Sequence, residues 1–165
     1  MSQTYLDTPT GEDQAAPKNF SIRLPRKSYR LRCISCEFKR SKAKPDGGGN
    51  NPMLEREWEV ISPETVTIKN ESGEDSKVTI SGLRVRDWLT MTAKTGMIVR
   101  ADSNRLGVEP PDDEAPNTQI YLGKEANAIL QTTVDTAKDE ETGKPILNSD
   151  DKPIVRYQHS IREWI

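Results

Sequence analysis

Apolar and polar residues alternate along several stretches of the chain, a pattern typical of β-strands with one buried face. The first predicted strand covers 29–38, where Leu31 and Cys33 share one face and Arg30 and Arg32 the other. The second covers 53–61 and alternates apolar residues with glutamates. Its two faces are Leu54, Arg56, Trp58 and Val60 on one side and Glu55, Glu57 and Glu59 on the other. We expect the face that contains Trp58 to lie in the core.

Strand-like stretches continue toward the end of the chain and are interrupted by one helical stretch. Apolar residues in 94–106 recur at loosely helical spacing and Gly107 follows as a candidate C-terminal cap, so a helix is predicted there. Within 83–89, the two faces are Leu83, Val85 and Leu89 on one side and Arg84, Arg86 and Trp88 on the other. The remaining predicted strands are 65–69, 77–80, 120–134 and 154–165.

Turn-forming residues separate these elements. The sequence KRSKAKPDGGGNNP at 39–52 combines a basic run with three consecutive glycines, which predicts a mobile hairpin tip. An acidic loop is predicted at 109–117 and a hairpin or extended loop at 139–153. Five or so strands, a basic first hairpin and one helix between the third and fourth strands predict a mainly β domain, an OB-type five-stranded barrel with long loops. A β-sandwich is the alternative.

Length and composition favour one domain with long polar loops. The chain has 165 residues, of which 33% are hydrophobic and 30% charged. Residues 1–18 are polar, acidic and aperiodic, which predicts a disordered N-terminal arm before a domain at 19–165. Residues 1–17 lack the pattern of a signal peptide, and no apolar run approaches the roughly 20 residues that span a bilayer. We expect a cytoplasmic protein without membrane association.

Charge is strongly segregated along the chain. Ten of the 24 Lys and Arg residues fall between Lys18 and Lys44, where Glu37 is the single acidic residue. The other residues carry 14 Lys and Arg against 25 Asp and Glu, a net charge of −11. Such a distribution favours a phosphate-binding surface on a molecule that repels polyanions elsewhere, although a basic face that is merely solvated is the alternative.

Candidate catalytic and metal-binding groups are few. Cys33 and Cys36 form a C-x-x-C, but a zinc site needs four ligands and His159 is the single histidine. On a regular strand residues three apart point to opposite faces, so these thiols are not expected to share a ligand. The acidic runs 112–114 and 150–151 are expected to be solvated. We predict neither an enzyme nor a cofactor or metal; a metal-dependent hydrolase that uses the acidic loops is the competing hypothesis.

Three features favour nucleic-acid binding. The cations of 39–44 lie on a glycine-rich loop suited to following a phosphate backbone. Stretch 83–89 places two arginines beside Trp88, and single-strand binders combine cations for phosphates with aromatic faces that stack on bases. The arginines of the first strand would extend this surface. The candidate set is Arg30, Arg32, Lys39, Arg40, Lys42, Lys44, Arg84, Arg86 and Trp88. For Trp88, packing in the core is the alternative.

Motifs that read base sequence are missing from the chain. It contains no zinc finger, basic zipper region or RRM signature, and nothing in it resembles a recognition helix. We therefore expect binding without strong sequence preference, and to single strands in preference to duplex. The pattern leaves DNA against RNA, the length of the binding site and the oligomeric state open.

Several short motifs resemble a family of phage-encoded proteins. They are Tyr29-Arg-Leu-Arg-Cys33, Lys39-Arg-Ser-Lys42, Asn51-Pro-Met-Leu54, Trp58-Glu-Val-Ile61, the stretch 82–89, Leu106-Gly107, 122–128 and Thr142-Gly-Lys144. The family resembled consists of OB-fold single-stranded-DNA-binding proteins of phage replication and recombination modules. The resemblance implies that Lys39, Lys42 and the Asn51-Pro52 turn flank bound DNA. It also implies replication or recombination proteins as partners.

A second hypothesis belongs to another functional class. A β-rich virion component or protein-recruiting adaptor would use the basic segment to bind an acidic protein instead of a nucleic acid. The two hypotheses differ in where they place Trp88: a buried Trp88, separated from the 39–44 loop, would favour the adaptor.

Overall fold

A computed structural model describes residues 22–69 and 72–165, so the predicted arm at 1–18 lies outside the described residues. In this part of the chain the strands are β1 (Ser28–Arg40), β2 (Pro52–Ser62), β3 (Thr65–Lys69), β4 (Asp75–Thr79), β5 (Arg84–Thr90), β6 (Glu125–Thr136) and β7 (Val155–Trp164). The helices are α2 (Gly96–Leu106) and the short 3₁₀ segments η1 (Ala93–Thr95) and η2 (Thr118–Tyr121).

Five of these strands form one antiparallel sheet in the order β5-β2-β1-β6-β7. The other two, β3 and β4, pair with each other in a hairpin between β2 and β5. Helix α2 follows β5 and precedes β6, so it lies between the third and fourth strands of the main sheet. The predicted mainly β fold with a five-stranded sheet, one helix between strands and long loops is therefore confirmed.

The predicted barrel is not confirmed, because the sheet is unclosed. Strands β5 and β7 are its edges, and among the described residues no ladder of hydrogen bonds joins them. The sheet is nevertheless strongly curled. Trp58 of β2 and Trp164 of β7 come from strands that β1 and β6 separate, yet their ring centroids lie 4.8 Å apart in an edge-to-face contact. We call the gap between β5 and β7 the seam.

The core forms inside this curl from the apolar faces of the strands. Trp58 is fully buried as predicted, and Tyr29, Leu31, Leu54 and Leu130 are equally inaccessible. Helix α2 adds Val99 and Leu106 to the same cluster. It ends at Gly107, whose φ of 69° and ψ of 35° place it in the left-handed region that glycine adopts without strain, as the sequence predicted.

A β-bulge in β1 changes the prediction for the cysteines. Cys33 pairs with Trp58 and Ser35 with Glu57, so Ile34 is an extra residue without a partner of its own. The alternation of inward and outward side chains along β1 therefore shifts by one residue, and Cys36 pairs with the buried Arg56. Both thiols therefore lie on the inner face, and the expectation that they point to opposite faces was wrong. Burial raises the pKa of Cys33 to about 11 and that of Cys36 to about 12.

One further predicted boundary differs from the structure. The predicted strand 120–134 begins only at Glu125, because η2 and a turn at Gly123 occupy the preceding residues. The predicted hairpin tip after β1 is tied by hydrogen bonds across it, including Ser41 N to Asn51 O at 2.9 Å and Lys44 N to Gly48 O at 2.8 Å. Gly49 is required there, since a Cβ would lie 2.1 Å from the carbonyl oxygen of Lys42.

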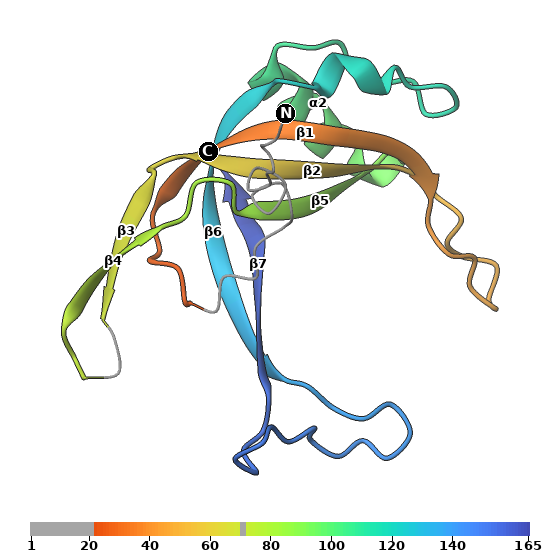
Figure 1. Ribbon diagram of the computed structural model, residues 1–165. Coiled ribbons are helices and arrows are strands. Elements are labelled where there is room, and N and C mark those ends of the chain that lie inside the picture. Colours follow the sequence, from red (N-terminus) through yellow and green to blue (C-terminus); the bar gives the residue numbers. More distant parts are fainter. Residues whose placement is uncertain (1–21, 70–71) are drawn as a thin grey trace, which may run out of the picture.

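Figure 1 shows three hairpins that extend away from the curled sheet in different directions. They are the β1–β2 connection, the β3–β4 hairpin and the long β6–β7 hairpin with its connection at 137–154. Among the described residues, no helix combines the length and the apolar character that crossing a bilayer requires.

Candidate nucleic-acid interface

Strand register brings most of the predicted site residues onto one face of the sheet. Side chains that pair across antiparallel strands lie on the same face. The outward rows across β1, β2 and β5 are Arg32–Glu59–Arg84, Ser35–Glu57–Arg86, Glu37–Glu55–Trp88 and Lys39–Met53–Thr90. Arg30 extends this surface beside β6, where it pairs with Asn127. We call this surface the outer face.

Trp88 lies on the outer face and not in the core. Its side chain is 55% exposed, and its Nε1 donates a hydrogen bond to Glu55 Oε2 at 3.1 Å. The indole is thus held at one edge while a large part of its surface meets solvent. The structure therefore places Trp88 at the surface, with Arg86 in the next row of the same strand.

Glutamates neutralise the arginines of the outer face. Glu57 lies between Arg84 and Arg86, with nearest N–O distances of 3.9 and 3.7 Å. On the other side of β2, Arg32 lies 3.5 Å from Glu59, and Glu125 of β6 lies 3.6 Å from Arg32 and 3.2 Å from Arg30. The outer face carries equal numbers of positive and negative side chains, so its net charge is zero. The cations are Arg30, Arg32, Lys39, Arg84 and Arg86, and the carboxylates are Glu37, Glu55, Glu57, Glu59 and Glu125.

Glu55 connects the cationic and aromatic parts of this face. One of its carboxylate oxygens accepts from Lys39 Nζ and the other from Trp88 Nε1. The hydrogen bond from Lys39 holds the pKa of Glu55 below its ordinary value, and the bond to Glu55 in turn raises the pKa of Lys39. Lys39 and the indole are therefore held on either side of one carboxylate.

The remaining predicted cations lie at and beyond the end of β1. Arg40 pairs with Pro52 on the opposite face of the sheet, where its guanidinium lies 6.0 Å from the Phe38 ring and donates to Asn50 O at 3.2 Å. Lys42 and Lys44 are exposed on the loop. Asp46 is the single acidic residue of 40–51 and accepts from the backbone N–H of Gly48. This loop therefore keeps an excess of positive charge that the outer face lacks.

A cleft follows the seam beside Trp88. It has a volume of about 400 Å³ and lies between β5, α2 and β7. Its sides include Trp88, Ile98, Trp164 and Arg162, and Ile98 is 62% exposed. Arg105 covers the Trp164 ring, with its guanidinium carbon 5.5 Å from the ring centroid. Sequence reasoning did not predict this cleft, because it forms only where the curl of the sheet brings its two edges to face each other.

A buried ion-pair network forms the floor of the cleft. Arg56 is fully buried and donates to Asp87 at 3.0 and 2.6 Å and to Asp102 at 2.8 and 2.9 Å. Burial alone would lower the pKa of Arg56, but the hydrogen bonds to Asp102 and Asp87 outweigh it and raise this pKa. Asp87 also accepts from Trp58 Nε1 at 2.9 Å. Each of these buried donors thus has a hydrogen-bond partner. The network links β2, which carries Arg56, to β5 through Asp87 and to α2 through Asp102.

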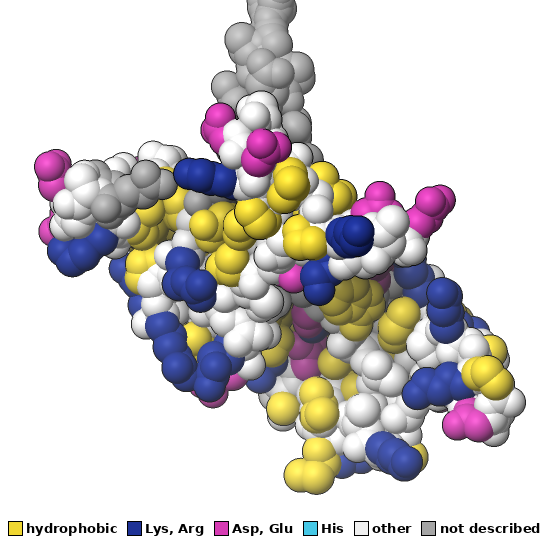
Figure 2. All heavy atoms as spheres, turned by 90° about the horizontal axis from the view of Figure 1, so that it is seen from below, with side chains coloured by type: hydrophobic (Ala, Val, Ile, Leu, Met, Phe, Trp, Pro, Cys, Tyr) yellow, Lys and Arg dark blue, Asp and Glu magenta, His cyan; other side chains and the backbone are white. Residues whose placement is uncertain are grey.

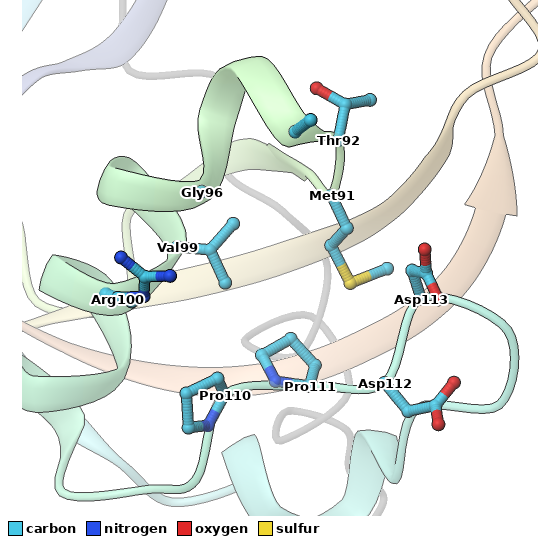
Figure 3. Close-up of a pocket in the computed structure, with 10 residues that line it drawn as sticks. Met91, Thr92, Gly96, Val99, Arg100, Pro110, Pro111, Asp112 and Asp113 are labelled. Carbon is cyan, nitrogen blue, oxygen red and sulfur yellow. The ribbon is translucent and has the colours of Figure 1, made fainter.

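The acidic loop at 109–117 forms one side of a separate pocket. Figure 3 shows Met91 and Val99 facing Pro110 and Pro111, while the carboxylate of Asp112 points away from the pocket. Asp112 accepts from the backbone N–H groups of Glu114 and Ala115, which lowers its pKa and fixes the turn. Within the described ranges, no group of three or more His, Cys, Asp and Glu side chains is arranged to hold a metal ion.

Surface charge of both signs is visible on the side of the molecule that Figure 2 shows. In Figure 2, which shows the molecule from below, Lys and Arg side chains are scattered among apolar patches and acidic groups instead of forming one continuous basic area. Comparison of the chain with protein-family models, curated proteins and solved structures finds no match.

Proposed function

We propose that this protein binds single-stranded nucleic acid, DNA in the first place, without strong sequence preference. The bases would stack on Trp88 and the phosphates would meet the cations of the outer face and of the 40–51 loop. The observation that carries this proposal is the 55% exposure of Trp88 on the face that it shares with five Lys and Arg side chains. Exposed aromatic faces beside cations are the usual means of binding single strands.

The fold is compatible with this function. OB-type domains bind oligonucleotides on the face of their second and third strands, beside the loop that connects the first two. In this chain β2 and β5 are the second and third strands of the main sheet, and the cationic loop connects β1 to β2. The resemblance of the sequence to phage single-stranded-DNA-binding proteins supports a role in phage replication or recombination, in the cytoplasm of the host.

The glutamates of the outer face restrict what binds there. A phosphate must displace Glu57 or Glu59 from an arginine before it gains that arginine as a partner. This exchange returns little free energy, because the lost and the gained ion pairs are both partly exposed. Stacking on Trp88 then supplies the larger share of affinity, and a polyanion without accessible bases gains little.

Fluorescence titration with oligo-dT tests the proposal. We expect the indole fluorescence to be quenched on binding, and affinity to fall with rising salt with a slope near −0.7 per phosphate contacted. Trp88→Ala should weaken binding by about 5- to 150-fold, which corresponds to about 1–3 kcal/mol of stacking, while Trp88→Phe should retain most of the affinity. If the protein neither changes its fluorescence nor retains DNA or RNA oligomers at low salt, the proposal is wrong.

A second function, that of a protein-binding adaptor, is favoured by one observation. The connection between β6 and β7 and the first residue of β7 expose Ile146, Leu147, Ile154 and Val155, which are 38–51% accessible. Contiguous exposed apolar patches often mark protein contacts, and the hydrogen bond from Ile154 N to Ile146 O at 2.9 Å brings two of these residues side by side. The adaptor hypothesis predicts that Leu147→Glu abolishes binding to the partner protein and that Trp88→Ala leaves this binding unchanged. The reverse result favours the nucleic-acid function.

A further inference from the structure

Three arginines that the outer face does not include line one pocket. The pocket has a volume of about 310 Å³ and is formed by Arg23, Leu24, Arg26, Leu130, Gln131, Thr132 and Arg162. No acidic residue is among these lining residues. In the described part of the chain, none of the three guanidinium groups belongs to an ion pair, whereas Arg30, Arg32, Arg84 and Arg86 all do.

The backbone around these arginines is fixed. Leu24, which lies between the two N-terminal arginines, is 6% exposed, and its N–H donates to Thr132 Oγ1 at 2.9 Å. The hydroxyl of the buried Tyr29 donates to the carbonyl oxygen of Pro25 at 2.7 Å. The segment that carries Arg23 and Arg26 is thus held at two consecutive residues, Leu24 by Thr132 of β6 and Pro25 by Tyr29 of β1.

Arg162 reaches the pocket through an irregularity in β7. Ile129 pairs with Glu163 and Leu130 with Ile161, so Arg162 is an extra residue in this ladder. A β-bulge of this kind commonly re-aims a side chain. Three guanidinium groups thus come together from two segments of the chain that are far apart in sequence. Like charges repel, and this arrangement is stabilised when an anion lies among them.

We propose that this three-arginine pocket binds a phosphate group of the polynucleotide that lies on the outer face, an inference that rests on the proposed function for the identity of its ligand. Guanidinium groups match the geometry of phosphate oxygens, and Gln131 and Thr132 add polar atoms beside them. The pocket extends the interface beyond the residues that the sequence indicated.

The seam cleft supplies the route from the outer face to this pocket. Trp88 lines the cleft at one side, and Arg162 lines both the cleft and the three-arginine pocket. A strand that stacks a base on Trp88 therefore continues along the seam, past Arg162, toward Arg23 and Arg26. The apolar side chains of Ile98 and Trp164 border this path and suit a base better than a phosphate.

The test compares two triple variants with equal net charge. The pocket variant is Arg23→Gln, Arg26→Gln and Arg162→Gln. The control variant is Lys77→Gln, Lys94→Gln and Arg100→Gln, which removes three exposed cations elsewhere. Both variants change the formal charge from −2 to −5. Circular dichroism and thermal unfolding establish that both fold as the unchanged protein does.

With a long oligo-dT, we expect the pocket variant to lose one phosphate contact. Its salt slope should become shallower by about 0.7, which amounts to about a 5-fold loss of affinity at 0.1 M salt. The quench of Trp88 at saturation should stay unchanged, because the base on the indole is retained. The control variant should keep the slope of the unchanged protein. Equal slopes in all three proteins would overturn the inference while leaving the proposed function in place.

A second measurement tests whether the three-arginine pocket binds phosphate, and it does not depend on binding of an oligomer. Pyrophosphate is titrated against the isotope-labelled protein, and backbone amide shifts are followed at Leu24, Gln131 and Thr132. We expect saturable shifts at these amides in the unchanged protein and in the control variant, and their loss in the pocket variant. Shifts that follow ionic strength alone, as with sodium chloride, would overturn the inference. Saturable pyrophosphate binding without any oligomer binding would contradict the proposed function and leave a phosphate site.

Discussion

Removing a carboxylate from the outer face should strengthen nucleic-acid binding. The substitution is Glu57→Gln, which keeps the shape and packing of the side chain and removes its charge. Glu57 neutralises Arg84 and Arg86 at N–O distances of 3.9 and 3.7 Å, and its side chain is 21% exposed. In the variant, a phosphate meets both arginines without first displacing an anion.

The size of the effect follows from the exposure of the two ion pairs. Partly exposed pairs are worth about 0.2–1 kcal/mol each, so a phosphate that replaces both recovers about 0.4–2 kcal/mol in the variant. This range corresponds to an affinity for oligo-dT that is about 2- to 30-fold higher. The salt slope should steepen, because Glu57 no longer takes up a counterion when the phosphate displaces it.

Titration of Glu57→Gln with oligo-dT, at several salt concentrations, measures this gain. The matched control is Glu109→Gln, which removes one exposed carboxylate in the 109–117 loop. Because both variants have the same net charge, long-range attraction alone would strengthen both equally. Unchanged affinity in Glu57→Gln, or an equal gain in both variants, would refute the conclusion that phosphates reach Arg84 and Arg86.

Three further predictions concern stability and the thiols. Asp102→Asn should destabilise the fold by about 1–3 kcal/mol, because it removes one of the charged partners of the buried Arg56. Asp75→Asn, in the exposed pair with Lys69, should cost less than about 1 kcal/mol. Urea unfolding of both variants measures the difference. The lowered pKa of Glu55 contributes stability that is present above its unfolded value and is lost as pH falls through the folded value. The raised pKa of Lys39 contributes stability that is lost as pH rises through its folded value. In Lys39→Met, unfolding midpoints measured across pH should lose the dependence at high pH and show a smaller one at low pH, because Arg86 and Trp88 still lower the pKa of Glu55. The buried Cys33 and the partly buried Cys36, with pKa values of about 11 and 12, should react with a thiol reagent at pH 8 much more slowly in the native protein than after unfolding; equal rates in the two states would contradict their position on the inner face.

The faces of the strands were predictable from the sequence, but their register was not. Alternation in 53–61 correctly assigned Trp58 to the core and the glutamates outward. It did not show that Glu57 stands opposite Arg86 and Glu59 opposite Arg84, because pairing depends on the loops and bulges between strands. The surface that was predicted to be cationic is therefore electrically neutral, because its arginines and lysine face glutamates on neighbouring strands. A single extra residue, Ile34, likewise moved Cys36 to the inner face.

The buried network left a signal in the sequence. Arg56 falls on the apolar face of 53–61, and Asp87 falls between Val85 and Leu89 on the apolar face of 83–89. Opposite charges on the inner faces of two strands predict a buried pair, because an isolated buried charge is very unfavourable. The third partner, Asp102, lies on the helix among buried residues and required the tertiary fold to be placed.

Neutralisation of the outer face gives a physical reason for the proposed preference for single strands. A duplex offers phosphates but keeps its bases stacked internally, so Trp88 gains nothing from it. Its phosphates must also compete with the glutamates that the arginines already hold. Glu57→Gln should therefore raise the affinity for duplex DNA by a larger factor than the affinity for oligo-dT, because each phosphate that is neutralised releases about 0.9 counterion from a duplex and about 0.7 from a single strand. Gel shifts of both probes with Glu57→Gln and Glu109→Gln measure the ratio; an unchanged ratio in Glu57→Gln means that the carboxylates do not select between the two forms of DNA.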